Sequence, residues 1–236
     1  MSEAHALPRI ETFPDAGLLA AAAAEIVGEA LNRRLREGAR RVRFVATGGS
    51  SPAGCYGRLK DWPLDWSRID VTLTDDRFVP PEAPDSNEAL VRKHLLRGAA
   101  AAASFLPLWS QASSPDEAAR RVEPAIGALL PFDVVLLGVG DDGHICSLFP
   151  HSPELAVGLD PEGKRRVIGV AKAGRPPFVP RISLTLAAIL DSGLVVVLTS
   201  GPAKKQVLEA ALAGHEVPVR AVLAQTRTPV RILWAP

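Results

Sequence analysis

The sequence has little of several residue types, and each shortage excludes a class of protein. Only two cysteines, Cys55 and Cys146, stand in 236 residues, with no Cys-x-x-Cys pair and no metal-ligand spacing. Such isolated cysteines are expected as buried thiols in a reducing compartment, although a bridge between them stays open. Aromatic residues make up 5% of the chain and the formal net charge is +1. A surface that stacks bases or attracts nucleic acid is therefore not expected, and a net charge this small gives no electrostatic reason for membrane binding.

Long apolar runs and targeting signals are also missing. The alanine run Ala20–Ala24 is followed by Glu25 and Glu29, so it falls well short of a membrane span. The first five residues lack the basic region and apolar core of a signal peptide, and we expect a cytoplasmic protein. Internal repeats and long low-complexity linkers are absent as well, which predicts a single domain over residues 1–236.

Strand-like and helix-like segments alternate along the whole chain. The predicted strands are Val42–Ala46, Ile69–Thr74, Val134–Val139, Val167–Ala171, Leu194–Thr199, Val219–Leu223 and Arg231–Trp234. The predicted helices are Asp15–Glu37, Pro52–Lys60, Asn87–Leu96, Pro115–Leu130, Leu184–Leu190 and Ala203–Ala213. This alternation predicts an α/β fold: a doubly wound, mostly parallel, Rossmann-like sheet with helices on both faces. Ser51-Pro52 and Ser114-Pro115 each have the pattern of a capping hydroxyl before a first-turn proline.

The most informative segment is Gly138-Val139-Gly140-Asp141-Asp142-Gly143-His144, which follows the apolar run Val134–Leu137. A continuous apolar run that ends in glycines is typical of a buried parallel strand that delivers a loop to the carboxyl edge of the sheet. Ligands of open α/β sheets bind at that edge. An imidazole is suited to proton transfer near neutral pH, so we interpret His144 as a catalytic residue with Asp142 beside it. The competing interpretation is an ordinary polar loop.

Two further loops follow strands and open helices. In Thr47-Gly48-Gly49-Ser50-Ser51-Pro52, the exposed amides of a helix N-terminus and the nearby hydroxyls favour an anion such as phosphate. This turn is neither Gly-x-Gly-x-x-Gly nor a Walker sequence, which disfavours a nucleotide. In Ser200-Gly201-Pro202-Ala203-Lys204-Lys205, a first-turn lysine can reach the same anion, and Lys204 is the better candidate. Taken alone, each loop could also be a plain strand-to-helix turn.

Two arginines complete the set of candidate residues. Arg77 follows Asp75 and Asp76 at the end of a predicted strand and offers a planar fork of donors for phosphate or for developing oxyanion charge. Arg181 stands just before a predicted helix, after Pro176-Pro177. A salt-bridged loop and an exposed arginine are the simpler interpretations of these two residues. If the sheet is parallel, the loops converge and form a pocket for a small phosphorylated polyol.

With these motifs in place, the chain resembles the family that joins bacterial-type 6-phosphogluconolactonases with glucosamine-6-phosphate isomerases/deaminases. The resemblance runs in order from about residue 40 to residue 210. Its most specific string is Asp-Gly-His-x-x-Ser-Leu-Phe-Pro at residues 142–150. The supporting segments are Thr47–Pro52, Asp75–Pro80 with Asp85–Asn87, Arg181–Thr185 and Ser200–Lys204. Two departures are mild: Asp76 stands where the family commonly has Glu, and Ile145-Cys146 replaces the usual Thr-Ala.

The resemblance implies hydrolysis of 6-phospho-D-glucono-1,5-lactone to 6-phosphogluconate. By that resemblance, His144 is the base that activates water, with Asp142 nearby. Gly48, Gly49, Ser50, Arg181 and Lys204 hold the 6-phosphate, while Arg77 and Asp75 contact substrate. No cofactor and no metal are expected, since a single His without a second His or Cys at ligand spacing makes zinc unexpected. The expected partner is the sugar phosphate lactone, with no nucleic acid and no membrane, in a monomer or a homodimer.

Two other functions stay open. An amino-sugar phosphate deaminase needs a further carboxylate that acts with the loop His, and the deaminases have it as a Glu in an Asn-Glu-Pro string after that His. Ser147-Leu148-Phe149-Pro150 stands there instead, without an acid. A sugar-phosphate sensor attached to a DNA-binding module is disfavoured because only one predicted helix precedes Val42 and no basic patch is present.

Overall fold

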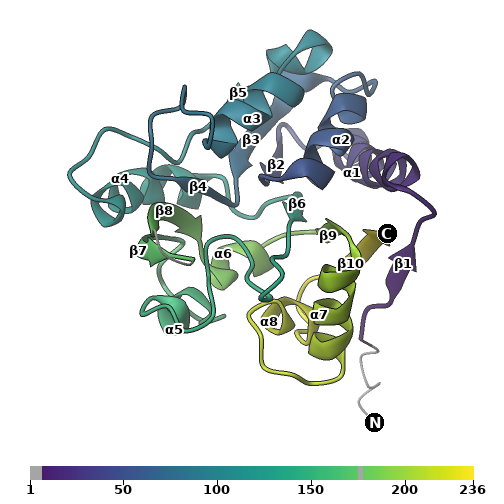
Figure 1. Cartoon of the computed structure of the whole chain (residues 1–236). Helices are drawn as coiled ribbons and strands as arrows, with labels where there is room; N and C mark the ends of the chain where they lie inside the picture. The colour runs from purple at the N-terminus through teal and green to yellow at the C-terminus, as the bar shows by residue number, and fades with distance from the viewer. Residues whose placement is uncertain (1–6, 175–177) are drawn as a thin grey trace.

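The computed structural model of the chain describes residues 7–174 and 178–236, and its central element is a seven-stranded sheet in which every pairing is parallel (Figure 1). The strands in sheet order are β1 (Ile10–Thr12), β10 (Val230–Ala235), β9 (Val195–Ser200), β6 (Val134–Leu137), β2 (Val42–Ala46), β3 (Ile69–Leu73) and β5 (Ser104–Phe105). The predicted doubly wound, mostly parallel sheet is therefore confirmed.

The chain crosses this sheet in two directions, which places helices on both faces. From β1 it runs through β2 to β3 and β5, then returns to β6 beside β2 and continues through β9 to β10. Because parallel crossovers are right-handed, helices on the outward path and on the return path cover opposite faces. Figure 1 shows α1 and α2 on one side of the strands and α7 and α8 on the other. The helices are α1 (Ala16–Arg36), α2 (Ser50–Leu59), α3 (Asn87–His94), α4 (Pro115–Ala128), α5 (Leu155–Gly158), α6 (Leu186–Leu190), α7 (Pro202–Leu212) and α8 (Arg220–Leu223), with short 3-10 helices at Trp66–Arg68 and Gly98–Ala102.

Local sequence explains why the main elements form where they do. All four residues of β6 are fully buried, as expected for a central strand that is covered on both faces. The Asp15 carboxylate accepts the Leu18 amide and begins α1, and the Ser114 hydroxyl accepts the Glu117 amide at the start of α4. Ser114 therefore acts as the predicted cap. The prediction for Ser51 is wrong, because α2 begins at Ser50, two residues before the predicted Pro52, and its cap is Gly49.

A second, antiparallel sheet was not predicted. It has three strands in the order β4 (Asp75–Arg77), β8 (Val179–Leu184) and β7 (Val167–Ala173), and α4 packs against it. The segment predicted as the parallel strand Val167–Ala171 belongs to this sheet. Arg181 lies within β8 rather than just before a helix, and Thr185 caps the later helix α6. In the β4–β8 pairing, Arg77 stands directly opposite Arg181.

The predicted strand Val219–Leu223 is wrong, because the chain forms helix α8 there. Its β-branched residues suggested a strand, but Val219, Val222 and Leu223 are the buried ones. Their i, i+3, i+4 spacing is that of one helix face. One continuous set of buried apolar residues connects both sheets. A single domain over residues 1–236 stays a prediction. None of the helices in the described part of the chain is long and apolar enough to cross a membrane.

Candidate active site

The site begins at the point where the strand order reverses. The chain leaves β2 toward β3 and later returns to β6 on the other side of β2, so the loops that follow β2 and β6 are neighbours at the carboxyl edge. A Cβ added at Gly138 would lie 3.8 Å from Thr47 Oγ1 and 3.9 Å from the Gly48 carbonyl oxygen. Open α/β sheets bind ligands in this crevice. The prediction that the glycine-rich loops converge on one edge is confirmed.

The loop after β6 holds an imidazole against a carboxylate. His144 Nδ1 lies 2.5 Å from Asp142 Oδ1, and the His144 amide donates to the same oxygen at 3.1 Å. Partial burial raises the pKa of Asp142, but the hydrogen bond and the charge of His144 outweigh it, so the net pKa lies below the usual range. An ionised carboxylate only accepts hydrogen bonds, so Nδ1 carries the proton and Nε2 is left as the basic nitrogen.

Backbone bonds and close packing fix this loop. The Gly140 amide donates to the His144 carbonyl and the Val219 amide of α8 donates to the Gly143 carbonyl, both at 2.9 Å. A Cβ at Gly140 would lie 2.1 Å from His144 Nδ1, so only glycine leaves room for the ring. The Phe149 ring packs against the imidazole, with centroids 4.1 Å apart. The glycines have the Gly-x-Gly-x-x-Gly spacing of dinucleotide sites, but residues 141–150 form turns instead of the helix that such sites require.

Two helix N-termini meet on the opposite wall. The caps of α2 and α7 are Gly49 and Gly201, with φ of 112° and 93°, and neither helix has a side-chain cap hydrogen bond. Ser51 Oγ and Ser200 Oγ lie 2.8 Å apart and join the first turn of α2 to the end of β9, just before the α7 cap. Lys204, in the first turn of α7, lines the cavity between them. Uncapped amides, the positive ends of two helices and an ammonium group together favour an anion.

A buried polar network supports the floor of the site. Asp75 Oδ2 accepts the Ser147 hydroxyl at 2.6 Å and lies 3.8 Å from the Arg181 guanidinium. That guanidinium also lies over the Phe149 ring, 5.6 Å from its centroid. Burial lowers the pKa of Arg181, while the charge of Asp75 opposes this effect and that of Arg77 adds to it. Among the described residues, Arg181 Nε is buried without a hydrogen-bond partner.

Arg77 is held by a residue that sequence reasoning did not assign to the site. Its Nη1 donates to Asn87 Oδ1 and to the Asp85 carbonyl, both at 2.8 Å. Asn87 opens α3 and lines the cavity, and its side chain fills the space that a Cβ at Gly48 would need, at 2.0 Å. The Ser86-Asn87 pair, a cap followed by the first helical residue, was the available sequence signal. The contact with Gly48 could not be deduced from it.

These side chains surround a cavity of about 270 Å³, close to the lower end of the usual range for small-molecule sites. Eight of the nine candidate residues line it: Gly48, Gly49, Ser50, Asp75, Arg77, His144, Arg181 and Lys204. The ninth, Asp142, contacts His144 instead. Lys205 is directed elsewhere, since its ammonium lies 4.4 Å from the centroid of the Trp234 ring. Cys146 also lines the cavity, and both cysteines are buried and unbonded.

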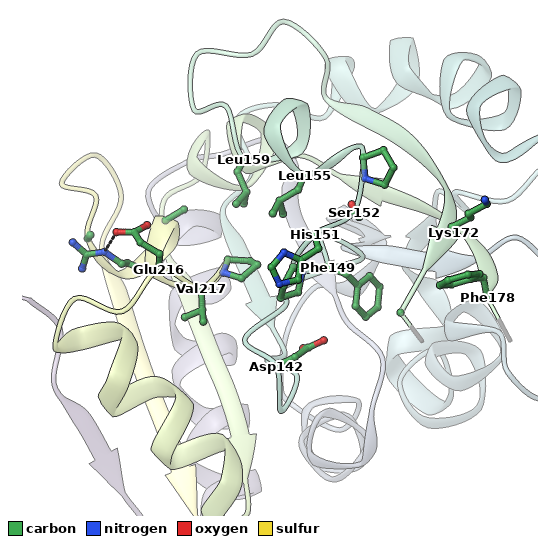
Figure 2. A pocket seen from close by; sticks show the side chains of 17 residues that line it. Asp142, Phe149, His151, Ser152, Leu155, Leu159, Lys172, Phe178, Glu216 and Val217 are labelled. Atoms are coloured by element: carbon green, nitrogen blue, oxygen red, sulfur yellow. Dashed lines mark hydrogen bonds and ion pairs between the residues drawn. The ribbon is translucent and has the colours of Figure 1, made fainter. Parts of the chain in front are cut away.

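A second and larger hollow, of about 1020 Å³, adjoins the His144 loop (Figure 2). Asp142 and Phe149 contribute to its wall, and Val217 and Leu155 give it an apolar surface. Its lining does not include the Gly48-Gly49 turn, the N-terminus of α2 or Lys204 of α7, so we place the candidate active site in the smaller one. Within residues 7–174 and 178–236, no three His, Cys, Asp or Glu side chains are grouped as a metal site would require.

Comparison with known proteins agrees with this arrangement. The sequence model of the family described as glucosamine-6-phosphate isomerases/6-phosphogluconolactonase matches residues 14–234. A 6-phosphogluconolactonase of Caulobacter vibrioides is 49% identical over 91% of both chains, and one of Pseudomonas aeruginosa is 44% identical over 91% of this chain and 89% of its own. A crystal structure of a 6-phosphogluconolactonase from Shewanella baltica is 33% identical, with a TM-score of 0.91 over 97% of this chain and 98% of its own. The chain therefore belongs to the family of glucosamine-6-phosphate isomerases and 6-phosphogluconolactonases.

Proposed function

We propose that this protein hydrolyses 6-phospho-D-glucono-1,5-lactone to 6-phosphogluconate, a step of the oxidative pentose phosphate pathway, with water that His144 activates. The observation that carries the proposal is the 2.5 Å contact between His144 Nδ1 and Asp142 Oδ1 beside a cavity that has two uncapped helix N-termini. The first feature suits proton transfer and the second suits a phosphate. Relatives at up to 49% identity carry the name of this lactonase.

His144 serves both halves of the reaction. Its Nε2 takes a proton from water while the water oxygen attacks the lactone carbonyl, and the imidazolium that results is stabilised by Asp142. The tetrahedral intermediate then collapses, the bond from the carbonyl carbon to the ring oxygen breaks, and Nε2 returns the proton to the leaving oxygen. The product is a carboxylic acid that ionises in water. One imidazole therefore acts first as base and then as acid.

The rest of the cavity orients the lactone and stabilises its charge. The Gly48-Gly49-Ser50 turn, Lys204 and Arg181 bind the 6-phosphate, and this remote binding energy fixes the ring against His144. The developing oxyanion is stabilised by Arg77 or by amides of the 138–144 loop. Within the described part of the chain, both side-chain hydrogen bonds of Arg77 use Nη1, which leaves Nη2 for the substrate. Asp75 holds Arg181 and contacts sugar hydroxyls.

One contact argues against the deaminase activity that also occurs in this family. That reaction moves a proton between two sugar carbons and needs a further carboxylate acting with the loop His, in addition to its partner Asp142. Here the apolar ring of Phe149 fills the place beside His144. A solved monomeric glucosamine-6-phosphate deaminase shares the fold with a TM-score of 0.77, over 96% of this chain and 97% of its own. At 17% identity, this likeness shows that the two proteins share a fold and says nothing about a shared reaction.

The test is a direct comparison of the two reactions. Freshly prepared lactone is added to purified protein at constant pH, and acid release is recorded against spontaneous hydrolysis. We expect accelerated lactone opening without added metal or nucleotide, and no ammonia from glucosamine 6-phosphate. Ammonia release with lactone opening at its spontaneous rate would instead establish a deaminase. Tight sugar-phosphate binding with neither activity would favour a sensor.

Two properties of the working enzyme belong to the same proposal. Buried, unbonded Cys55 and Cys146 suit a reducing compartment, which supports the cytoplasm as the site of action. The enzyme acts as a monomer or a homodimer.

A further inference from the structure

Asp76 is a fully buried carboxylate that the proposed reaction does not use. Its two oxygens accept four hydrogen bonds, three from the amides of Arg77, Asn87 and Glu88 at 2.6–3.0 Å and one from the Ser86 hydroxyl at 3.2 Å. Carboxylates are seldom fully buried in proteins unless they are fully paired, as this one is. Asp76 therefore joins strand β4 to the first turn of helix α3.

The residue that Asp76 fixes most tightly is Asn87, whose amide gives the shortest of these bonds, 2.6 Å. The Asn87 side chain in turn makes three contacts in the substrate cavity. Its Nδ2 donates to the Asp75 carbonyl and its Oδ1 accepts from Arg77, both at 2.8 Å. Its side-chain amide also packs directly on Gly48. The position of Asn87 therefore determines where Arg77 and the Gly48 turn can lie.

We propose that Asp76 is a positioning residue: by holding the N-terminus of α3 it sets Asn87, and through Asn87 it sets the Arg77 guanidinium that contacts substrate. This inference rests on the proposed function for the identity of the substrate. Asp76 itself is fully buried and does not line the substrate cavity. Its effect on catalysis is transmitted by a chain of three hydrogen-bonded residues.

Asp76→Asn is the informative change. An amide keeps the size of the carboxylate, but it replaces one accepting oxygen with an NH₂ group that only donates. If that group takes the place of Oδ2, it faces the Glu88 amide and the Ser86 hydroxyl; if it takes the place of Oδ1, it faces the amides of Arg77 and Asn87. The first turn of α3 must shift to separate these donors. A shift of about 1 Å at a substrate-contacting group is enough for a loss of one to two orders of magnitude in kcat/KM.

The control is Asp133→Asn. Asp133 is a carboxylate whose side chain is 8% exposed; it accepts the Arg43 backbone amide at 2.8 Å and pairs with Arg34. It precedes β6 at the amino end of the strand, the opposite edge of the sheet from the cavity. Both variants lose hydrogen bonds of one kind, so both should lower the melting temperature. Only the change at Asp76 should alter kinetics.

A double-mutant cycle separates positioning from loss of stability. In the wild-type background, Asp76→Asn should lower kcat/KM at least about tenfold, whereas in an Arg77→Ala background it should lower it less than about threefold, because the group that it positions is gone. The same cycle is measured as 6-phosphogluconate affinity by calorimetry, which requires no turnover. Asn87→Ala, which removes the link but keeps Asp76, should reproduce the coupling if Asp76→Asn does not fold.

The outcomes are distinct from those for the proposed function. An active wild type with equal losses in both Arg77 backgrounds, or with Asp133→Asn as damaging to kcat/KM as Asp76→Asn, would overturn the positioning role and leave the lactonase intact. A wild type that does not accelerate lactone opening would overturn the lactonase. In that case, the calorimetric cycle still decides whether Asp76 acts through Arg77.

Discussion

Replacing Gly140 by alanine should disable the His144–Asp142 pair without unfolding the protein. The added Cβ would lie 2.1 Å from His144 Nδ1 and Cε1, and 2.8 Å from Asp142 Oδ1. An unstrained contact begins near 3.4 Å, so the ring must move by about 1.3 Å or rotate away from the carboxylate. A displacement of this size at a reacting group typically costs about 10²-fold in rate, or about 2.7 kcal/mol of transition-state stabilisation.

Gly138→Ala is the matched control. Neither glycine has a positive φ, so alanine is compatible with the backbone at both positions, and the nearest atom to a Cβ at Gly138 is 3.8 Å away. We expect kcat close to the wild-type value for Gly138→Ala, a loss of about 10²-fold for Gly140→Ala, and similar melting temperatures for both. In a His144→Ala background, Gly140→Ala should have no further effect on rate. Wild-type kcat in Gly140→Ala, or an equal loss in both glycine variants, would refute the reasoning.

Three further expectations follow from the site. His144→Ala should lower kcat by about 10²–10⁴ while 6-phosphogluconate still binds, and an unchanged kcat at neutral pH would remove His144 from the mechanism. Lys204→Ala and Arg181→Ala should each weaken 6-phosphogluconate binding by about 1.5–3 kcal/mol and hardly change hydrolysis of the unphosphorylated lactone. Lys205→Ala is the control and should change neither. Equal losses on the phosphorylated and unphosphorylated lactones would mean that the two residues have structural roles. Burial raises the pKa of Asp76 to about 6 from 3.8, against its backbone hydrogen bonds and with Asp75 adding to the rise. The stability that the protonated Asp76 contributes is therefore complete below pH 4 and is lost as the pH rises through 6. In urea titrations, the free energy of unfolding of the wild type relative to Asp76→Asn should fall by about 3 kcal/mol between pH 4 and pH 7.5. A difference that does not depend on pH would contradict the raised pKa.

The central sheet could be predicted because its signals are local. Val134–Leu137 is a continuous apolar run followed by glycines, and this pattern identifies both a buried strand and the edge at which its loop emerges. The second sheet could not be predicted in the same way. Strand β4 has three residues, two of them acidic, and is a strand only because β8 pairs with it. Its carboxylates are stabilised by tertiary hydrogen bonds that the sequence does not reveal.

The same distinction holds for the candidate site. His144 and Asp142 are two residues apart in one tight loop, so their proximity followed from the sequence. Asn87 reaches Gly48 across 39 positions, and a close approach of that kind depends on how two loops pack. The choice of Lys204 over Lys205 rested on helix geometry alone, and the structure places Lys204 at the cavity and Lys205 on Trp234. Whether Lys204 binds phosphate stays a prediction.

The direct opposition of Arg77 and Arg181 across β4 and β8 implies a conflict between durability and activity. Like charges at facing positions of a sheet repel each other, and here the nearby carboxylates Asp75, Asp76 and Asp85 moderate the repulsion in part. An anionic ligand relieves it, so the empty enzyme carries an electrostatic strain that the occupied enzyme does not. A selection for heat resistance alone would therefore favour neutral residues at these two positions and would remove the substrate contacts that we propose for them. Bound 6-phosphogluconate should protect the wild type more than either neutral variant.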